Sequence, residues 1–349
     1  MKRLTSMCAC VLMGMTTLVL AGSGCRKTQD DAFRGGVPTR EAVVLHLPGA
    51  PDDGGGATTA TTTTSASTST IHSALVGQQA DTYTVTRDVT AIVNGGTWAV
   101  LTLVRTIVDY PATTVSTDAA VWGPYTDALS PNTWRLSVTR TQPHEYAWLL
   151  EARAKTESND AFRTIISGDH MAAVDAQDDP IEGFGNGTFA IDWDAAATLP
   201  EHDTNVGKAA FTYSRLTPTA VVTVAVDFTG IQDQTTKEIF NAVYRYSSAP
   251  GQGGSLSYAE DKDNFPGPGP TGTAKEHFTI DSRWTEAGVG RCDFEDQGGD
   301  LKTVAHGSEC WDASFASVYR NLDYSSAATD NWGAETSCTA FPMALYSSL

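Results

Sequence analysis

The chain has 349 residues, of which 41% are hydrophobic and 18% are charged, and its formal net charge at pH 7 is −18. This length fits two domains, or one large β domain with an additional tail. The excess of 41 Asp and Glu over 23 Lys and Arg would repel a phosphate backbone, which argues against nucleic acid as a partner.

Residues 1–24 predict a secretory signal peptide. Lys2 and Arg3 precede an apolar stretch over residues 7–20, and small residues follow at positions 21–24. A transmembrane helix needs about 20 apolar residues, and this stretch is shorter, so we expect it to be cleaved rather than to span a membrane.

The small residues lead into a cysteine, in the segment Leu20-Ala21-Gly22-Ser23-Gly24-Cys25. This segment resembles the lipobox of bacterial lipoproteins, although Gly22 stands where that family has Leu, Val or Ile. The resemblance implies cleavage between Gly24 and Cys25 and acylation of Cys25, with chains such as palmitate that hold the protein on a membrane. Because residue 26 is Arg and not Asp, we expect the outer membrane of the cell envelope. Cleavage after Ser23 is the alternative, and it would leave a soluble periplasmic or secreted protein.

Cysteine usage predicts a disulfide near the C-terminus. Once the signal peptide is removed and Cys25 is acylated, Cys292, Cys310 and Cys338 remain. We expect Cys310 to pair with Cys338, because both lie in a stretch rich in aromatic and small residues, and Cys292 to be buried in a strand. The other two pairings stay open. None of the three has the spacing of a zinc site.

The chain between the anchor and the predicted domain falls into two parts. Residues 25–48 form an anchor-proximal segment whose one apolar run, at residues 42–45, can add a strand. Residues 49–70 are rich in Thr, Ser and Gly and bury too little apolar surface to offset their ordering entropy. We therefore expect a flexible tether with a root-mean-square reach of about 25 Å, followed by one β-rich domain over residues 71–349.

The beginning of this domain, residues 71–111, predicts a helical hairpin. Apolar residues recur at helical spacing over residues 85–93, and residues 97–110 have a polar face that includes Arg105. Asn94-Gly95-Gly96 separates the two runs with residues typical of a helix C-cap, and Pro111 ends the second run.

From residue 120 to residue 349 the hydrophobic period changes to two, which indicates half-buried strands. Turns rich in Gly and Pro separate the strands, so consecutive strands become antiparallel neighbours. We expect about nine to eleven strands in a meander that curls into a half-barrel or barrel, with the helical hairpin packed on it. The clearest strands cover residues 134–138, 146–150, 189–193, 209–213, 222–228, 242–246, 256–258 and 278–280.

This order of elements resembles the lipoprotein-carrier architecture, a half-barrel covered by helices that holds acyl chains. Four segments also resemble uncharacterised myxobacterial lipoproteins over residues 74–345. That second resemblance implies an envelope location and one domain, and it implies no activity. The segments are Ala74-Leu75-Val76-Gly77-Gln78-Gln79-Ala80, Val93-Asn94-Gly95-Gly96-Thr97, Val121-Trp122-Gly123-Pro124-Tyr125-Thr126-Asp127-Ala128-Leu129 and Ser308-Glu309-Cys310-Trp311-Asp312.

The search for catalytic motifs favours no enzyme. The sequence has no nucleophile elbow, phosphate-binding loop or zinc-protease helix. The best metal candidate is the acidic run that contains Asp261 and Asp263, but Phe265 and Pro266 stand where a calcium loop needs its next oxygen ligand and a Gly. We therefore assign no metal and no cofactor.

Aromatic residues on the predicted strands are the one group that suggests a ligand. They can line a concave sheet that holds an acyl chain or another apolar ligand, or they can form the core under the helices. The sequence thus favours a lipid-anchored, non-catalytic structural or interaction module, and the alternative is a carrier or sensor of lipid. It identifies neither a protein partner nor a ligand. The aromatic candidates are Trp134, Trp148, Phe189, Trp193, Phe211 and Tyr213.

Overall fold

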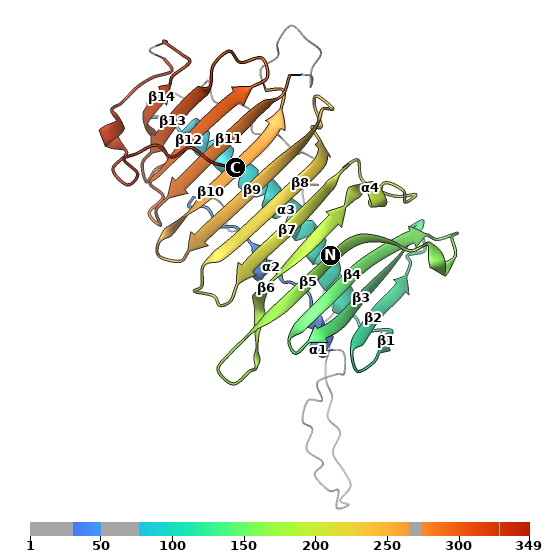
Figure 1. The fold of residues 1–349 in the computed structure, drawn as a ribbon. Coiled ribbons are helices and arrows are strands. Elements are labelled where there is room, and N and C mark those ends of the chain that lie inside the picture. The colour runs from blue at the N-terminus through green and yellow to red at the C-terminus, as the bar shows by residue number, and fades with distance from the viewer. Residues whose placement is uncertain (1–30, 50–76, 265–273, 328) are drawn as a thin grey trace, which may run out of the picture.

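The structure is a computed structural model that describes residues 31–49, 77–264, 274–327 and 329–349. The predicted signal peptide, the cleavage site at Gly24 and Cys25, and all of the predicted tether except Gly49 lie outside these residues. The described chain forms one antiparallel sheet of 14 strands, which stand side by side in sequence order (Figure 1).

Each strand pairs with the next strand in the sequence, so the mainly β meander predicted from the hydrophobic period is confirmed. The strands are β1 (Thr114–Val115), β2 (Ala119–Tyr125), β3 (Asn132–Gln142), β4 (Glu145–Ala154), β5 (Arg163–Val174), β6 (Pro180–Asp192), β7 (Lys208–Arg215), β8 (Val222–Gln232), β9 (Ile239–Ala249), β10 (Gly253–Lys262), β11 (Glu276–Trp284), β12 (Gly290–Gly298), β13 (Ala305–Trp311) and β14 (Ser317–Leu322). The helices are α1 (Asp31–Arg34), α2 (Arg40–Val43), α3 (Asp81–Val108) and α4 (Trp193–Ala196), and the short 3₁₀ turns are η2 (Asn159–Ala161) and η3 (Glu335–Ser337).

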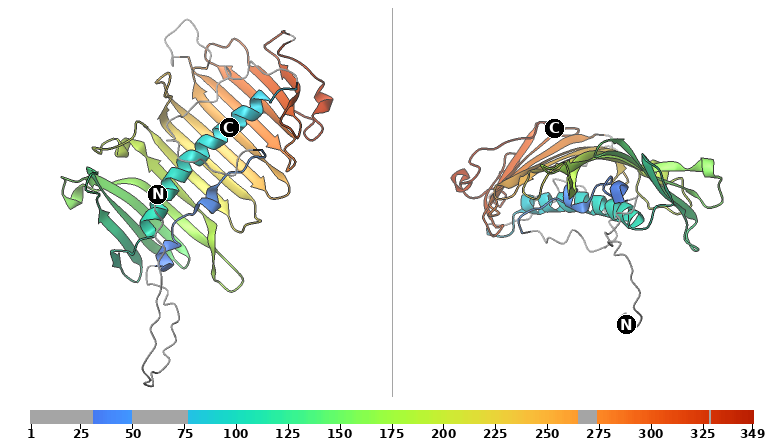
Figure 2. Two further views of the ribbon diagram at one scale, coloured as in Figure 1. Left: turned by 180° about the vertical axis from the view of Figure 1, so that it is seen from behind. Right: turned by 90° about the horizontal axis from the view of Figure 1, so that it is seen from below.

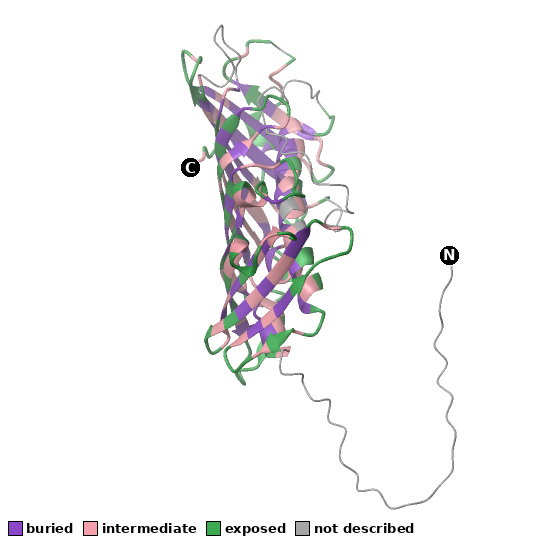
Figure 3. Cartoon of the chain, turned by 90° about the vertical axis from the view of Figure 1, so that its right-hand side faces the viewer, coloured by how far each residue is buried: buried purple, intermediate pink, exposed green. Residues whose placement is uncertain are grey.

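Alternation of apolar and polar residues gives the sheet one buried face. In β8, Val222, Val224 and Val226 are buried, whereas Thr223 and Asp227, which each follow one of these valines, are exposed. We call the buried side the inner face and the opposite side the outer face. Seen edge-on, buried residues run along the strands and exposed residues gather in the connecting loops (Figure 3).

The sheet arches over the helices and does not close, so the barrel alternative is wrong and an open, curved sheet is found (Figure 2). Sheets of more than about ten strands rarely stay flat, and curling lets the inner face wrap a central layer. The two edges are short or covered. β1 has only two residues, and Arg320 of β14 makes an isolated bridge with Trp332.

The predicted helical hairpin is wrong, because α3 is a single helix that runs without a break through Asn94 and Gly95. Asn94 does not cap a helix end. Its side-chain Nδ2 donates to Leu45 O at 2.9 Å, and its Oδ1 accepts from Leu45 N at 3.0 Å. This paired contact, together with burial of Val89 and Val93, outweighs the local preference for a break.

The helix α3 lies along the inner face and crosses most of the sheet (Figure 2). Its first turn is held by β13, where Glu309 Oε2 accepts from Thr82 N at 2.9 Å and from Thr82 Oγ1 at 2.8 Å. Just past its last turn, Trp122 Nε1 of β2 donates to Tyr110 O at 2.8 Å. By length and composition alone α3 also qualifies as a membrane span, but here it packs against the sheet.

The segment before the predicted tether belongs to the folded unit. Residues 31–49 form α1, α2 and a short extended stretch that pack beside α3 on the inner face, without adding a strand (Figure 2). Phe33, Val37 and Ala42 are buried, and Tyr246 Oη donates to His46 O at 2.7 Å. The Thr- and Ser-rich residues therefore lie between two parts of the same fold, and they do not separate this fold from Cys25.

The C-terminal residues cover part of the outer face, across β11 to β13 (Figure 1). The predicted disulfide between Cys310 and Cys338 is present and joins this segment to β13. Arg291 of β12, which is fully buried, donates to Glu335 Oε1 at 2.9 Å and to Phe341 O at 3.2 Å. As predicted, Cys292 is a buried free thiol in a strand.

Candidate functional site

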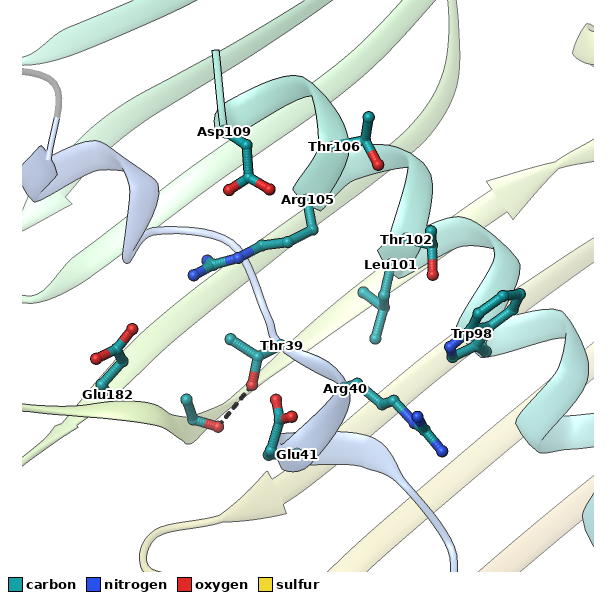
Figure 4. Close-up of a pocket in the computed structure, with 11 residues that line it drawn as sticks. Thr39, Arg40, Glu41, Trp98, Leu101, Thr102, Arg105, Thr106, Asp109 and Glu182 are labelled. Atoms are coloured by element: carbon teal, nitrogen blue, oxygen red, sulfur yellow. Dashed lines mark hydrogen bonds between the residues drawn. The ribbon is translucent and has the colours of Figure 1, made fainter. Parts of the chain in front are cut away.

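A cavity of about 570 Å³ opens on the inner side of the molecule, between α2, the second half of α3 and the strand β6 (Figure 4). This volume is in the range of small-molecule sites in proteins. The lining residues are Thr39, Arg40, Glu41, Trp98, Leu101, Thr102, Arg105, Thr106, Asp109, Glu182 and Gly183. We refer to this cavity as the α2/α3 pocket.

Helical spacing and one backbone contact build the walls of the α2/α3 pocket. Trp98, Thr102 and Arg105 project from successive turns of α3, while Leu101 on the same helix is buried against the core. On the opposite wall, Thr39 Oγ1 donates to Gly183 O at 2.8 Å and fixes the start of α2 on β6 (Figure 4).

Charged groups of both signs line the α2/α3 pocket without pairing with one another. Among the described residues, the Arg105 side chain makes one hydrogen bond, from Nη1 to Arg34 O at 3.3 Å, and no ion pair. The carboxylates of Glu41, Asp109 and Glu182 are exposed and make no ion pair within the described chain. Figure 4 shows Arg105 reaching across the pocket toward the wall that carries Glu41 and Glu182. The pocket lining therefore contains two arginines and three carboxylates, so it can offer both signs of charge to one ligand.

The structure brings four of the six predicted aromatic residues together on the inner face. Phe189 stacks on Phe211 with ring centroids 4.3 Å apart, and it also meets Trp148 at 6.3 Å and Tyr213 at 6.1 Å. All four rings are at most 4% exposed and belong to the hydrophobic core. They pack against one another as a core does.

The other two predicted aromatic residues lie at the margin of this cluster. Trp134 of β3 and Trp193 at the start of α4 are half-buried and pack against the edge of the core. The sequence alternation placed Trp134 on the correct side of the sheet, whereas Trp193 begins α4 and does not belong to the predicted strand. Neither residue joins the four central rings.

A histidine that sequence reasoning did not select lies beside these rings. His170 Nδ1 and Tyr213 Oη are 2.7 Å apart, and both side chains are buried. Burial lowers the pKa of His170 to about 4, since the charged imidazolium is poorly solvated there. The imidazole is therefore neutral at pH 7 and forms a structural hydrogen bond in the core.

Buried carboxylates gather at one end of the inner face, on β10 to β12. Glu260 and Asp296 both lie opposite Phe278 in the strand register, on either side of it. Burial raises the pKa of Glu260 to about 7, and burial together with the charges of Glu276 and Glu260 raises that of Asp296 to about 7. Glu260 Oε1 and both carboxylate oxygens of Asp296 are buried and have no hydrogen-bond partner in the described chain.

The predicted metal candidates do not come together. Asp261 faces the outer side, where its Oδ1 is 2.7 Å from His277 Nδ1, and Asp263 follows the end of β10. Within the described ranges, no group of three or more His, Cys, Asp or Glu residues is arranged to hold a metal ion.

No family model, curated protein or solved structure matches this chain. The site must therefore be interpreted from its own geometry.

Sequence reasoning missed the α2/α3 pocket because its walls come from three distant parts of the chain. Arg105 was recognised as part of a polar helix face, but nothing local indicated that α2 and β6 would face it. Glu260 is the first residue of the acidic run that was considered for a metal, and the strand period would have placed it on the buried side with Tyr258.

Proposed function

We propose that this chain is a lipid-anchored, non-catalytic protein of the bacterial cell envelope whose β domain acts as an interaction module. The main support for the proposal is that the chain's own segments cover the inner face of the sheet but only part of its outer face. The chain's own helices occupy the inner face, and the C-terminal segment covers the outer face at β11 to β13 (Figure 1). No helix or tail among the described residues lies over the outer face of β3 to β9.

The uncovered outer face is suited to binding another macromolecule. It carries small and polar side chains such as Thr212 and Thr223 together with exposed apolar residues such as Leu149 and Met171. Such a mixed surface is compatible with a non-obligate protein interface, which is about as apolar as the rest of a protein surface. No cavity is needed for such a role.

The alternative function, a carrier of lipid or another apolar ligand, has less support. A carrier needs free volume among the apolar rings of the inner face, whereas Phe189 and Phe211 are stacked on each other and are covered by the core. The α2/α3 pocket is lined mostly by polar and charged residues, which do not suit an apolar ligand. This favours the interaction module over the carrier.

The position of α1 supports close attachment to the membrane surface. If Cys25 is acylated, six residue steps separate it from Asp31, and they span at most about 20 Å when fully extended. Because α1 packs on the inner side, that side is turned toward the membrane and the outer face is turned away from it. Two or three acyl chains hold such an arrangement stably.

Mass analysis of the protein extracted from its own envelope tests the anchor. We expect a denatured mass that equals residues 25–349 plus acyl groups, and we expect the Cys25→Ser variant to lose these groups and move to the soluble fraction. An unmodified chain beginning at Gly24 would overturn the anchored model in favour of a soluble envelope protein.

Native mass analysis of the same preparation tests the choice between module and carrier. We expect no lipid held among the aromatic rings of the inner face to be retained in stoichiometric amount. A lipid released on denaturation, and lost when Phe211 is replaced by a charged residue in a chain that still folds, would favour the carrier.

A further inference from the structure

The α2/α3 pocket lies where the chain from the proposed anchor enters the fold. Arg105 Nη1, on the pocket wall, donates to Arg34 O, and Arg34 is the last residue of α1. This hydrogen bond links the pocket wall directly to α1, the first described element after the proposed acylation site at Cys25. The exposed lining residues that α3 contributes, Thr102, Thr106 and Asp109, lie on the side of this helix that faces away from the sheet.

The charges of the pocket fit a ligand that carries both signs. The guanidinium of Arg105 can make paired hydrogen bonds to a phosphate, and the pocket lining also includes the hydroxyl groups of Thr102 and Thr106. The carboxylates of Glu41 and Glu182, on the opposite wall, suit an ammonium group. A purely anionic ligand would be repelled by these carboxylates, and a purely cationic one would leave Arg105 uncompensated.

We propose that the α2/α3 pocket binds a phosphoethanolamine group, with the phosphate on Arg105 and the ammonium between Glu41 and Glu182. The source is the headgroup of a zwitterionic phospholipid in the membrane that holds the acyl chains. This choice of source rests on the proposed function, because the reach from Cys25 brings the pocket side of the molecule to the headgroup layer. The chemistry of the pocket itself does not depend on the anchor.

The first experiment measures binding of free O-phosphoethanolamine by calorimetry, using the mature protein in a detergent without phospholipid. We expect saturable binding that is at least tenfold stronger than that of inorganic phosphate or of ethanolamine alone, because each of these compensates only one sign of charge. Equal binding of inorganic phosphate and phosphoethanolamine would overturn the proposal.

Two substitutions locate the site. Arg105→Gln and Glu182→Gln should each weaken binding of phosphoethanolamine at least tenfold, and Glu182 is exposed, so its replacement does not threaten folding. The matched control is Arg87→Gln, which removes an arginine from the same helix outside the pocket and should leave binding unchanged. Loss of binding in the control, or none in either pocket variant, would contradict the assignment.

The second experiment identifies the source of the ligand. The acylated protein is placed in phosphatidylcholine nanodiscs with and without phosphatidylethanolamine, and amide hydrogen exchange is measured over residues 98–109. We expect slower exchange with phosphatidylethanolamine, and no such difference for Arg105→Gln. Binding of free phosphoethanolamine without this protection would exclude the lipid headgroup and leave a soluble ester as ligand. An unacylated mass would refute the proposed anchor without affecting the calorimetric result.

Discussion

The buried carboxylate of Glu260 should make the protein less stable as the pH rises. Its side chain is 1% exposed, and Oε2 accepts from Tyr258 Oη at 2.7 Å, while Oε1 has no hydrogen-bond partner in the described chain. Burial raises its pKa from 4.5 to about 7. Between these two values the folded state binds more protons than the unfolded state, so the free energy of unfolding falls with increasing pH.

The magnitude follows from the pKa difference. Each pH unit between the unfolded and the folded pKa corresponds to about 1.4 kcal/mol, so ionisation of Glu260 costs the folded protein about 3 kcal/mol above pH 7. Glu260→Gln removes this cost, because the amide is neutral at every pH and its oxygen can still accept from Tyr258. The new amide N–H also supplies a donor near Asn264, whose Oδ1 is buried without a partner in the described chain.

Urea denaturation at several pH values measures the effect. We expect Glu260→Gln to match the unmodified protein within about 1 kcal/mol at pH 4 and to be more stable by about 3 kcal/mol at pH 8. Glu182→Gln, which changes an exposed carboxylate, is the control and should show no such pH dependence. If Glu260→Gln were destabilised by the same amount at both pH values, the ionised carboxylate would be making a favourable contact and the reasoning would be refuted.

Three further predictions concern the C-terminal segment, α3 and the free thiol. Replacing Cys310 and Cys338 together by Ser should lower the free energy of unfolding by about 3 to 4 kcal/mol, as expected for opening a loop of 28 residues, and an equal midpoint in urea would contradict this. Asn94→Ala should lower the free energy of unfolding by about 2 kcal/mol in the same assay, because it removes both hydrogen bonds to Leu45. A decrease below about 0.5 kcal/mol would mean that these hydrogen bonds are not what keeps α3 continuous at this position. Burial raises the pKa of the Cys292 thiol, so peptide mapping should find it alkylated only after denaturation, and rapid labelling in the native protein would argue against its burial.

The strands predicted from the sequence are those in which large apolar residues alternate with polar ones. β5 escaped this pattern because Gly168 lies opposite Trp148, whose indole occupies the space that a side chain would need, and because His170 takes the next inward position. In β13 the inward residues include Gly307 and Glu309, which serve the packing of Phe294 and the first turn of α3. A search for alternating large apolar residues therefore misses strands whose inward positions are Gly or polar residues that make room for, or bind, neighbouring elements.

The elements that sequence reasoning misplaced depend on contacts between distant residues. Asn94 and Leu45 are 49 residues apart, and only their pairing explains why α3 continues where a break is locally favoured. The same holds for the α2/α3 pocket, where Thr39 of the N-terminal segment meets Gly183 of β6, 144 residues away. The disulfide was predictable because three cysteines allow only three pairings. Asn94 and Thr39, in contrast, can bind almost any backbone group, so the sequence does not restrict their partners.

The length of α3 determines how strongly the sheet can bend. Its 28 residues correspond to about 42 Å of helix, whereas the eleven steps from β2 to β13 correspond to about 53 Å along a flat sheet. Since Tyr110 is bound to β2 and Thr82 to β13, the helix acts as the chord of an arc. Lengthening α3 by two turns would relax the arc toward a plane, and shortening it would draw the two edges of the sheet closer together.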